Sequence, residues 1–226
     1  TRAVTKPQAD AFLKESHLLA VLIVSDEEDC SIKDNGTFDS PDWTNNKVNT
    51  ACHLPESQLD YLISPNEFYK KLTEIKPANA IVFAGIIGVP LTKEAPGCEG
   101  FGTGLGDCLD LDEMHYDAVQ ASPTSPFLLE YACTREEGGE VVTTSGPGRR
   151  YVEMAKLFGT NGYIYSICNE DWKEAMKAIA KLIAANVSSS CYEDRLDWVR
   201  TDLSECGEGA TSCGSAKCDL VVEYPY

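Results

Sequence analysis

The chain has 226 residues, of which 43% are hydrophobic, and this composition suits a globular domain rather than a disordered chain. The 36 acidic residues outnumber the 19 lysines and arginines, and the net charge of −17 disfavours binding to nucleic acid or to anionic membranes. No run of about 18 uninterrupted apolar residues occurs, so the sequence predicts no membrane-spanning segment.

Strands and helices are predicted to alternate along the chain. After a short helix over residues 7–16, the apolar run 18–24 is typical of a parallel strand that is buried on both faces. A helix over 66–76 leads to a second buried strand over 80–89, so these two strands are expected to be parallel. The later elements are a helix over 148–159 that ends at Gly159, a strand over 162–168, and a helix over 171–186 with a buried stripe of Trp172, Met176, Ile179 and Ile183. This alternation predicts an α/β fold with a parallel, doubly wound, Rossmann-like sheet.

Two segments depart from this pattern. Residues 90–147 form a long insertion rich in glycine, proline, aspartate and cysteine, and so long a loop is normally functional or cross-linked. Residues 188–226 are a polar, cysteine-rich C-terminal extension, with an edge strand expected over 220–224. We therefore divide the chain into an α/β domain, residues 1–187 with its insertion at 90–147, and the extension at 188–226.

Ten cysteines occur, and none forms a C-x-x-C pair, which disfavours zinc ribbons and thioredoxin-like redox sites. Structural disulfides are the simpler interpretation, and they imply a secreted or cell-surface protein; ten free thiols in a cytosolic chain would be unusual. Spacing does not decide the pairing, but local pairs are expected for Cys30 with Cys52, Cys98 with Cys108 and Cys213 with Cys218. The other cysteines are Cys133, Cys168, Cys191 and Cys206.

An acidic cluster directly follows the predicted strand over 18–24. Ligands of open parallel sheets bind at the carboxyl ends of the strands, and oxygen ligands suit Mg²⁺ or Ca²⁺, so we expect a cation site here; the alternative is a solvated acidic loop. A second cation loop is expected inside the insertion, with an ordinary turn as the alternative. The candidate ligands are Ser25, Asp26, Glu27 and Asp29 in the first loop, and Asp107, Asp110 and Asp112 in the second.

No catalytic residue is assigned from the sequence. The chain has no G-x-S-x-G motif, and no histidine is placed where a Ser-His-Asp triad can be argued.

The stretch FLKESHLLAVLIVSDEEDCS, residues 12–31, resembles a segment of von Willebrand factor A-type domains. It is most similar to the cysteine-rich versions in predicted secreted or lipoprotein bacterial proteins. Three later features resemble the same group: YKKL at 69–72 before the second strand, the loop cysteine Cys98, and YSICNEDW at 165–172. The resemblance covers residues 7–187, interrupted by the insertion.

The resemblance implies a doubly wound sheet and a metal-ion-dependent adhesion site. In that site a D-x-S-x-S loop, a threonine and an aspartate after the fourth strand bind the cation; Asp26 matches this aspartate, and Ser25 precedes it. No D-x-S-x-S occurs before Asp26, so the resemblance implies a partial fold without its N-terminal half. A partial sheet leaves a central strand edge unpaired, and we expect a separate chain, a neighbouring subunit or the cysteine-rich extension to cover it.

These observations favour a non-enzymatic, secreted or cell-surface protein that mediates adhesion or assembly with another protein chain, with a divalent cation joining Asp26 to the partner. Two alternatives stay open. One is an extracellular, metal-assisted hydrolase that uses the acids around Asp26 and the insertion as a substrate wall. The other is a purely structural, disulfide-stabilised subunit of a surface assembly.

Overall fold

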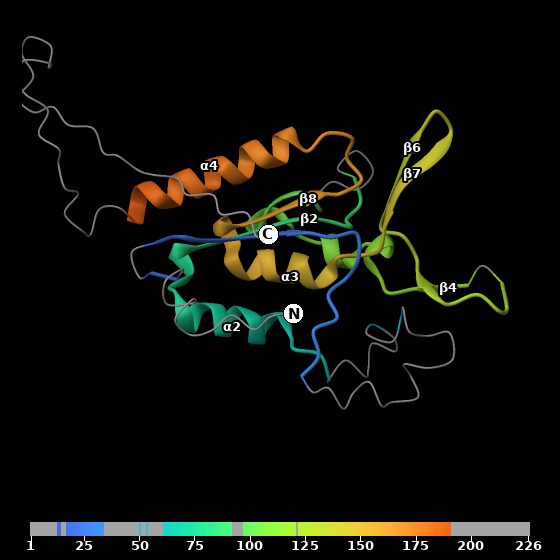
Figure 1. The fold of residues 1–226 in the computed structure, drawn as a ribbon, viewed down its shortest axis with the longest axis horizontal. Coiled ribbons are helices and arrows are strands. Elements are labelled where there is room, and N and C mark those ends of the chain that lie inside the picture. The colour runs from blue at the N-terminus through green and yellow to red at the C-terminus, as the bar shows by residue number, and fades with distance from the viewer. Residues whose placement is uncertain are drawn as a thin grey trace, which may run out of the picture.

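The protein is a mixed α/β fold around a four-stranded, mostly parallel sheet, seen in a computed structural model (Figure 1). The sheet has the order β1-β2-β8-β3, in which β1 (Leu19–Val24), β2 (Ile81–Ile87) and β8 (Gly162–Ser166) are parallel. The short strand β3 (Gly100–Phe101) pairs antiparallel with β8. The structure describes residues 13–14, 17–33, 50, 53, 61–91, 97–120 and 122–190.

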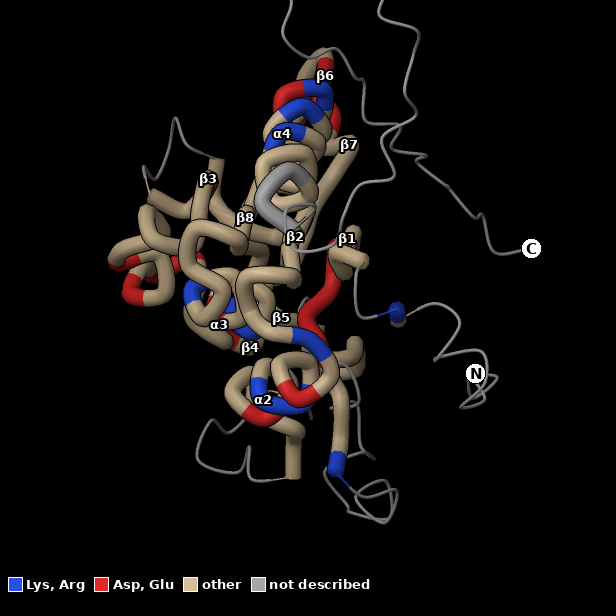
Figure 2. The backbone as a smooth tube through the Cα atoms, turned by 90° about the vertical axis from the view of Figure 1, so that its left-hand side faces the viewer, with Lys and Arg blue, Asp and Glu red and all other residues tan. Residues whose placement is uncertain are grey.

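Helices cover both faces of this sheet. The helices α2 (Pro65–Ile75) and α3 (Arg149–Phe158) lie on one face, and α4 (Lys173–Ser190) lies on the other (Figure 2). Alternate side chains of β2 explain the arrangement, because Phe83 packs in the cluster with α3 while Ala84 packs in the cluster with α4. The predicted strands and helices between residues 18 and 186 are thus confirmed, and β1 and β2 are parallel as expected.

The burial of β1 differs from the prediction. The sequence predicted a strand buried on both faces, but the side chains of β1 alternate between half-buried and exposed. On the exposed face, Leu22 is 42% and Val24 is 51% accessible, although their register partners Ala84 and Ile86 in β2 are both buried. The prediction was wrong because it treated β1 as an interior strand, whereas β1 lies at the edge of the described sheet.

The two helices on the α3 face begin in different ways. Ser64 caps α2 through a capping box, in which the Ser64 hydroxyl accepts from the amide of Glu67 and the Glu67 carboxylate accepts from the amide of Ser64. Helix α3 follows Gly148, which has no side chain to cap it. Helix α3 ends at Gly159, where a φ of +57° suits glycine, so the predicted C-terminal cap is confirmed.

The buried stripe of α4 also differs from the prediction. Ile179 is buried as expected, but Trp172 and Met176 are 38% and 49% accessible. The helix instead buries Ala175 and Leu182 against the sheet. Its apolar residues therefore extend beyond the contact with the sheet, which hydrophobic periodicity alone does not reveal.

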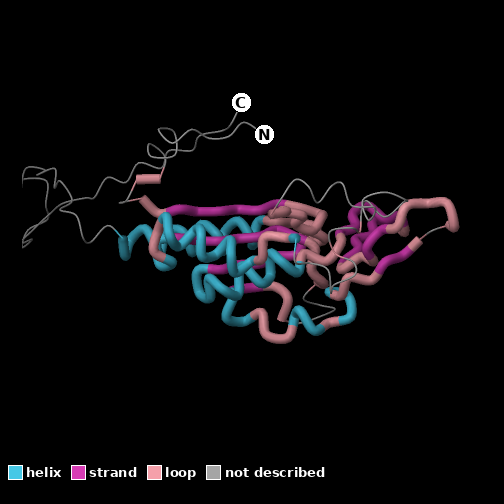
Figure 3. Tube along the Cα trace, turned by 90° about the horizontal axis from the view of Figure 1, so that it is seen from below, coloured by secondary structure: helices cyan, strands magenta, loops and turns pink. Residues whose placement is uncertain are grey.

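The insertion places additional short elements at the carboxyl ends of the parallel strands, on one side of the molecule (Figures 1 and 3). Two antiparallel ribbons project there, one formed by β4 and β5 and the other by β6 and β7. The remaining short 3₁₀ helices are η4 (Ala78–Ala80) before β2 and η8 (Gly159–Asn161) before β8. The elements of the insertion are η5 (Gly102–Gly104), η6 (Cys108–Asp110), η7 (Asp112–Met114), β4 (Ala118–Val119), β5 (Leu128–Leu129), β6 (Cys133–Glu137) and β7 (Glu140–Ser145).

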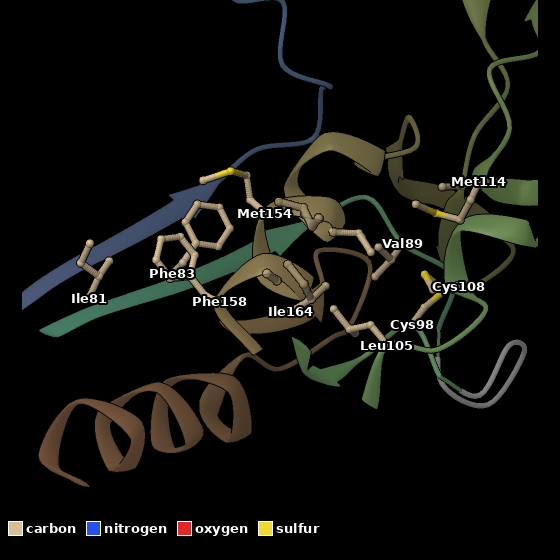
Figure 4. Close-up of a cluster of buried hydrophobic side chains, with 14 residues drawn as sticks. Ile81, Phe83, Val89, Cys98, Leu105, Cys108, Met114, Met154, Phe158 and Ile164 are labelled. Atoms are coloured by element: carbon tan, nitrogen blue, oxygen red, sulfur yellow. A yellow bond between two sulfur atoms is a disulfide. The ribbon is translucent and has the colours of Figure 1, made fainter. Parts of the chain in front are cut away.

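A cluster of buried apolar side chains joins the insertion to the sheet (Figure 4). The ring of Phe158 in α3 stacks on Phe83 of β2 at 5.8 Å between centroids, and it meets Tyr69 of α2 edge to face at 4.9 Å. Cys98 and Cys108 belong to the same cluster, so part of the insertion is core rather than surface loop.

Disulfides are present, and one of the predicted pairs is confirmed. Cys98 is bonded to Cys108, one of the expected local pairs, whereas the bond between Cys133 and Cys168 was not predicted. Cys30 is also disulfide-bonded, and its partner lies outside the described residues. The pairs Cys30–Cys52 and Cys213–Cys218, the helix at 7–16 and the strand at 220–224 fall wholly or partly outside those residues and stay predictions.

Candidate functional site

The acidic loop after β1 is held by its backbone at the carboxyl edge of the sheet. The amide of Ser25 donates to the carbonyl of Ile86 at the end of β2. The carbonyl of Asp26 accepts from the amide of Gly146, at 3.1 Å, and from the hydroxyl of Ser145, at 2.7 Å. The end of β7 is therefore fastened to the first residues after β1, which places the insertion directly beside the predicted cation loop.

The side chains of Asp26 and Glu27 are exposed at this edge. The Ser25 hydroxyl donates to the carbonyl of Glu27 and accepts from the Glu27 amide, which makes a tight local turn. Partial burial, and then the charge of Asp26, raise the pKa of Glu27 above its ordinary value. Two of the predicted ligands thus lie at the edge as neighbouring carboxylates, while the hydroxyl of Ser25 is already used within the turn.

Asp29, the fourth predicted ligand, is engaged in an ion pair. Its Oδ2 accepts from both Nε and Nη2 of Arg150, at 3.0 and 2.9 Å, and its Oδ1 accepts from the hydroxyl of Ser31 at 2.6 Å. Arg150 lies at the start of α3 and is buried. Asp29 therefore fixes the loop to α3 and does not join Asp26 and Glu27 in a common ligand set.

Glu28 is the residue that sequence reasoning missed, and it is the buried member of the loop. Its Oε2 accepts from the hydroxyl of Tyr116, at 2.7 Å, and from the backbone amide of Arg150, at 3.0 Å. Its Oε1 accepts from the amide of Asp29 at 2.9 Å. Glu28 thereby caps the amino end of α3, which Gly148 leaves without a side-chain cap. No pattern in the acidic run distinguishes Glu28 from its neighbours.

Burial dominates the electrostatics around Glu28. It raises the pKa of Glu28 to about 7, although the hydrogen bonds from Tyr116, Arg150 and Asp29 act in the opposite direction. Burial, and then the charge of Glu28, raise the pKa of the Tyr116 hydroxyl well above its ordinary value. His53 lies against the Tyr116 ring at 5.0 Å, and its burial lowers its pKa to about 4. Within the described part of the chain, Nδ1 of His53 has no hydrogen-bond partner.

A pocket of about 310 Å³ opens beside this network, between the amino ends of α2 and α3. Arg149, one of its polar groups, is already engaged, because it donates to the carbonyls of Leu109 and Met114 and lies over the Tyr116 ring at 5.5 Å. Among the residues the structure describes, no hydrogen bond between a hydroxyl and a histidine is seen, and the hydroxyl of Tyr116 is bonded to the Glu28 carboxylate. The pocket is lined by Leu62, Ser64, Pro65, Tyr116, Arg149, Arg150 and Glu153.

The second predicted cation loop is a series of exposed turns. Asp107, Asp110 and Asp112 all have exposed side chains around η6 and η7. Within the described ranges, no group of three or more histidine, cysteine, aspartate or glutamate side chains is gathered as a metal site. The described carboxylates thus do not complete a cation site on their own in either loop, and Mg²⁺ or Ca²⁺ binding stays a prediction.

The outer edge of β1 is the other notable feature of this region. Within the part of the chain that the structure describes, β1 pairs with β2 alone, so its second edge has no strand beside it. Its exposed residues Leu22 and Val24 lie on the face that α4 covers elsewhere. The acidic loop with Asp26 begins at the end of this same strand, so the open edge and the carboxylates form one continuous region.

No family model, no curated protein and no solved structure matches this chain. The expected similarity to von Willebrand A-type domains therefore stays a prediction. Among the described helices, none combines the length and the apolar character that a membrane crossing requires. The disulfides are consistent with an extracellular location, because such bonds persist in oxidising compartments.

Proposed function

We propose that the protein is a secreted or cell-surface, von Willebrand A-like module that assembles with another protein chain along the open edge of β1. The observation that carries the proposal is the exposure of Leu22 and Val24 on a strand that has no partner on its outer side among the described residues. The module is proposed to act by binding rather than by catalysis.

The composition of β1 is unusual for an exposed edge. Its sequence, LAVLIV, contains no charged residue and no proline. Natural proteins protect exposed edges with such residues, because unpaired amide and carbonyl groups promote association with other strands. An apolar, unprotected edge therefore favours a strand that is covered in the working assembly, and this supports a partner at β1.

The geometry also indicates what the partner must supply. A strand beside β1 would satisfy its free amide and carbonyl groups. A second, apolar element is needed above Leu22 and Val24, because α4 contributes Ala175 and Ile179 to the packing over β2 rather than over β1. We therefore propose that the partner contributes a strand followed or preceded by an apolar helix, as the resemblance implies for the other half of the fold.

A divalent cation at Asp26 is part of this proposal only if the partner supplies further ligands to it. Asp26 and Glu27 are the carboxylates that lie at the edge beside β1 without an ion pair among the described residues, whereas Asp29 is neutralised by Arg150. Mg²⁺ and Ca²⁺ bind six or more oxygen ligands, so a cation held at Asp26 needs further ligands from outside this set. The hydrolase alternative has less support, because Tyr116 and Arg149, two of the polar groups that line the pocket, already donate hydrogen bonds to Glu28 and to the carbonyls of Leu109 and Met114.

The proposal is tested by cross-linking at β1. A photoreactive benzoylphenylalanine replaces Leu22 in the protein produced in its native host, and the cross-linked peptides are identified by mass spectrometry. The matched control carries the same group at Ile75, which is 54% exposed at the end of α2. We expect a peptide of another chain to be captured from position 22 and not from position 75.

Other outcomes distinguish the alternatives. Cross-links from position 22 to residues 191–226 of the same molecule would favour the purely structural subunit and contradict assembly at β1. The absence of any cross-link at position 22 would also contradict the proposal. The cross-linking is repeated in excess EDTA to test the role of the cation. A lower yield of cross-linked product would support a cation at the interface, and an unchanged yield would remove the cation from the proposal.

A further inference from the structure

The ribbon formed by β6 and β7 is held firmly at its base. Cys133, the first residue of β6, is bonded to Cys168 just beyond β8. At the end of β7, the Ser145 hydroxyl donates to the carbonyl of Asp26, and the Ser145 carbonyl accepts from the amide of Ala132. The ribbon is thus fastened to the carboxyl ends of both β1 and β8, and it projects from the body of the molecule (Figure 1).

The outer half of the ribbon exposes apolar side chains. Val141 is 57% and Val142 is 45% accessible, and both belong to β7. With Thr143 and Thr144 they form a run of four β-branched residues, which strongly favours an extended conformation. Two adjacent valines contribute little to folding when they face water, so their position suggests a surface that becomes buried on binding.

Within the described ranges, no strand lies along the outer edge of β7. Among the described residues, β7 pairs with β6 alone, and a ribbon of two strands is marginally stable without a third strand or a packed face. The other strand, β6, is protected by Arg135, Glu136 and Glu137, which are the charged residues that discourage pairing at an edge. The edge of β7 is the more apolar of the two: its only charged residue is Glu140, and the ladder is irregular opposite Arg135 and Glu136, where Val142 is the extra residue.

The charged residues of the ribbon indicate which kind of partner would bind at the edge of β7. The ribbon has three glutamates against one arginine, and Arg135 is already paired with Glu137 at 3.4 Å. Glu136 and Glu140 have no ion pair in the described part of the chain. A second copy of this chain would bring a further net charge of −17, so self-association is disfavoured and a basic partner is favoured.

We propose that the outer edge of β7 binds an extended, basic segment of another protein as a third strand of the ribbon. In such strand addition, backbone hydrogen bonds provide affinity, and alternate side chains provide specificity. Apolar side chains of the segment would pack on Val141 and Val142, and its lysines or arginines would lie beside Glu140, with Glu136 one strand further away on β6. This interface is separate from β1, so each can be present without the other.

The test uses a blocked peptide, KVTVKVTK, titrated into the ¹⁵N-labelled protein and followed by NMR, with EVTVEVTE as the acidic control. We expect the basic peptide to shift the amides of Glu140–Ser145, and the acidic peptide to leave them unchanged. The double substitution Val141→Ser, Val142→Ser should weaken binding about tenfold, as the loss of apolar contact predicts. The substitution pair Glu136→Lys, Glu140→Lys should also weaken binding of the basic peptide.

The control variant is Val119→Ser in the neighbouring ribbon, where Val119 is 42% exposed, and it should bind the peptide with unchanged affinity. Equal affinity for the two peptides would overturn the inference, and so would an affinity that the serine substitutions in β7 do not change. Shifts confined to Leu19–Val24 would overturn it as well, while leaving the proposed assembly at β1 intact.

Discussion

The strands β1 and β2 are alike in sequence but differ in their surroundings. Both are apolar, they are parallel, and each residue of β1 has a partner in β2. All seven residues of β2 are buried, whereas β1 exposes alternate residues because its outer edge and part of one face have no cover among the described residues. Composition thus predicts a strand but not its position in the sheet. Where composition suits the interior and the position is at an edge, as in β1, we propose that the strand is a surface for binding.

The largest expected effect comes from truncating register partners on the two strands. Ile86 is 1% exposed and its partner Val24 is 51% exposed, so Ile86→Ala leaves a cavity and Val24→Ala does not. We expect Ile86→Ala to lower the free energy of unfolding by about 3 kcal/mol and Val24→Ala by less than about 1 kcal/mol. Urea unfolding measures both, and equal losses would show that β1 is covered within the chain.

The second prediction concerns the residue that follows β2. A side chain on Gly88 would overlap the carbonyl oxygen of Gly146, because the loop that leads into α3 crosses β2 at this point. We expect Gly88→Ala to cost about 2 kcal/mol of stability through this overlap. Gly104 has open space where its side chain would be, so Gly104→Ala is the control and should change the unfolding midpoint little. Similar midpoints for both variants would contradict the close crossing.

The third prediction concerns Glu28, beyond the end of β1. Because burial raises its pKa from 4.5 to about 7, the folded protein retains a proton that the unfolded chain releases between these pH values. Its contribution to stability is therefore fully present below pH 4.5 and is lost as the pH rises to about 7. Glu28→Gln carries no charge, so the stability of the wild type relative to this variant should fall by a few kcal/mol at most across that range.

His53 contributes to the pH dependence in the opposite direction. Its pKa is lowered from 6.5 to about 4, so its contribution to stability is present above pH 6.5 and is lost as the pH falls toward 4. Both proteins contain His53, and the difference between them isolates Glu28. Denaturant unfolding at several pH values measures this difference, and a difference that does not vary with pH would contradict a buried, ionisable Glu28.

The smallest effect on stability is expected at the exposed face of β1. Leu22→Lys should change the free energy of unfolding by less than about 0.5 kcal/mol, because Leu22 is 42% accessible. The same change should reduce association of the isolated chain, since a charged residue protects an edge strand. Light scattering at increasing concentration compares the two proteins. A large loss of stability would indicate that Leu22 is buried against the protein's own chain.

The apolar runs made the main elements predictable. Residues 18–24, 80–89 and 162–168 became three parallel strands, because continuous apolar segments between helices leave few other arrangements. The glycine that ends α3 was also identifiable, since its position past the last helical turn favours a left-handed conformation. These features depend on local sequence, and local sequence was sufficient to find them.

The residues missed by sequence reasoning depend on distant contacts. Glu28 looks like any other acid in its run, and its burial is determined by Tyr116 and Arg150, which lie 88 and 122 residues away. The bond between Cys133 and Cys168 joins the insertion to the end of β8, and cysteine spacing carries no sign of it. The placement of Asp26 at the sheet edge was foreseeable from strand direction, but the pairing of Asp29 with Arg150 was not.

The capping of α3 by Glu28 has a consequence for how the protein folds. A short helix without a side-chain cap of its own is marginal in water, so a peptide of residues 145–160 should be largely unstructured. The carboxylate that completes its first turn arrives from a segment far earlier in the chain, and closing so long a loop is slow. Helix α3 is therefore expected to become stable only when the end of β1 docks, which links the helical and sheet layers in one cooperative folding step.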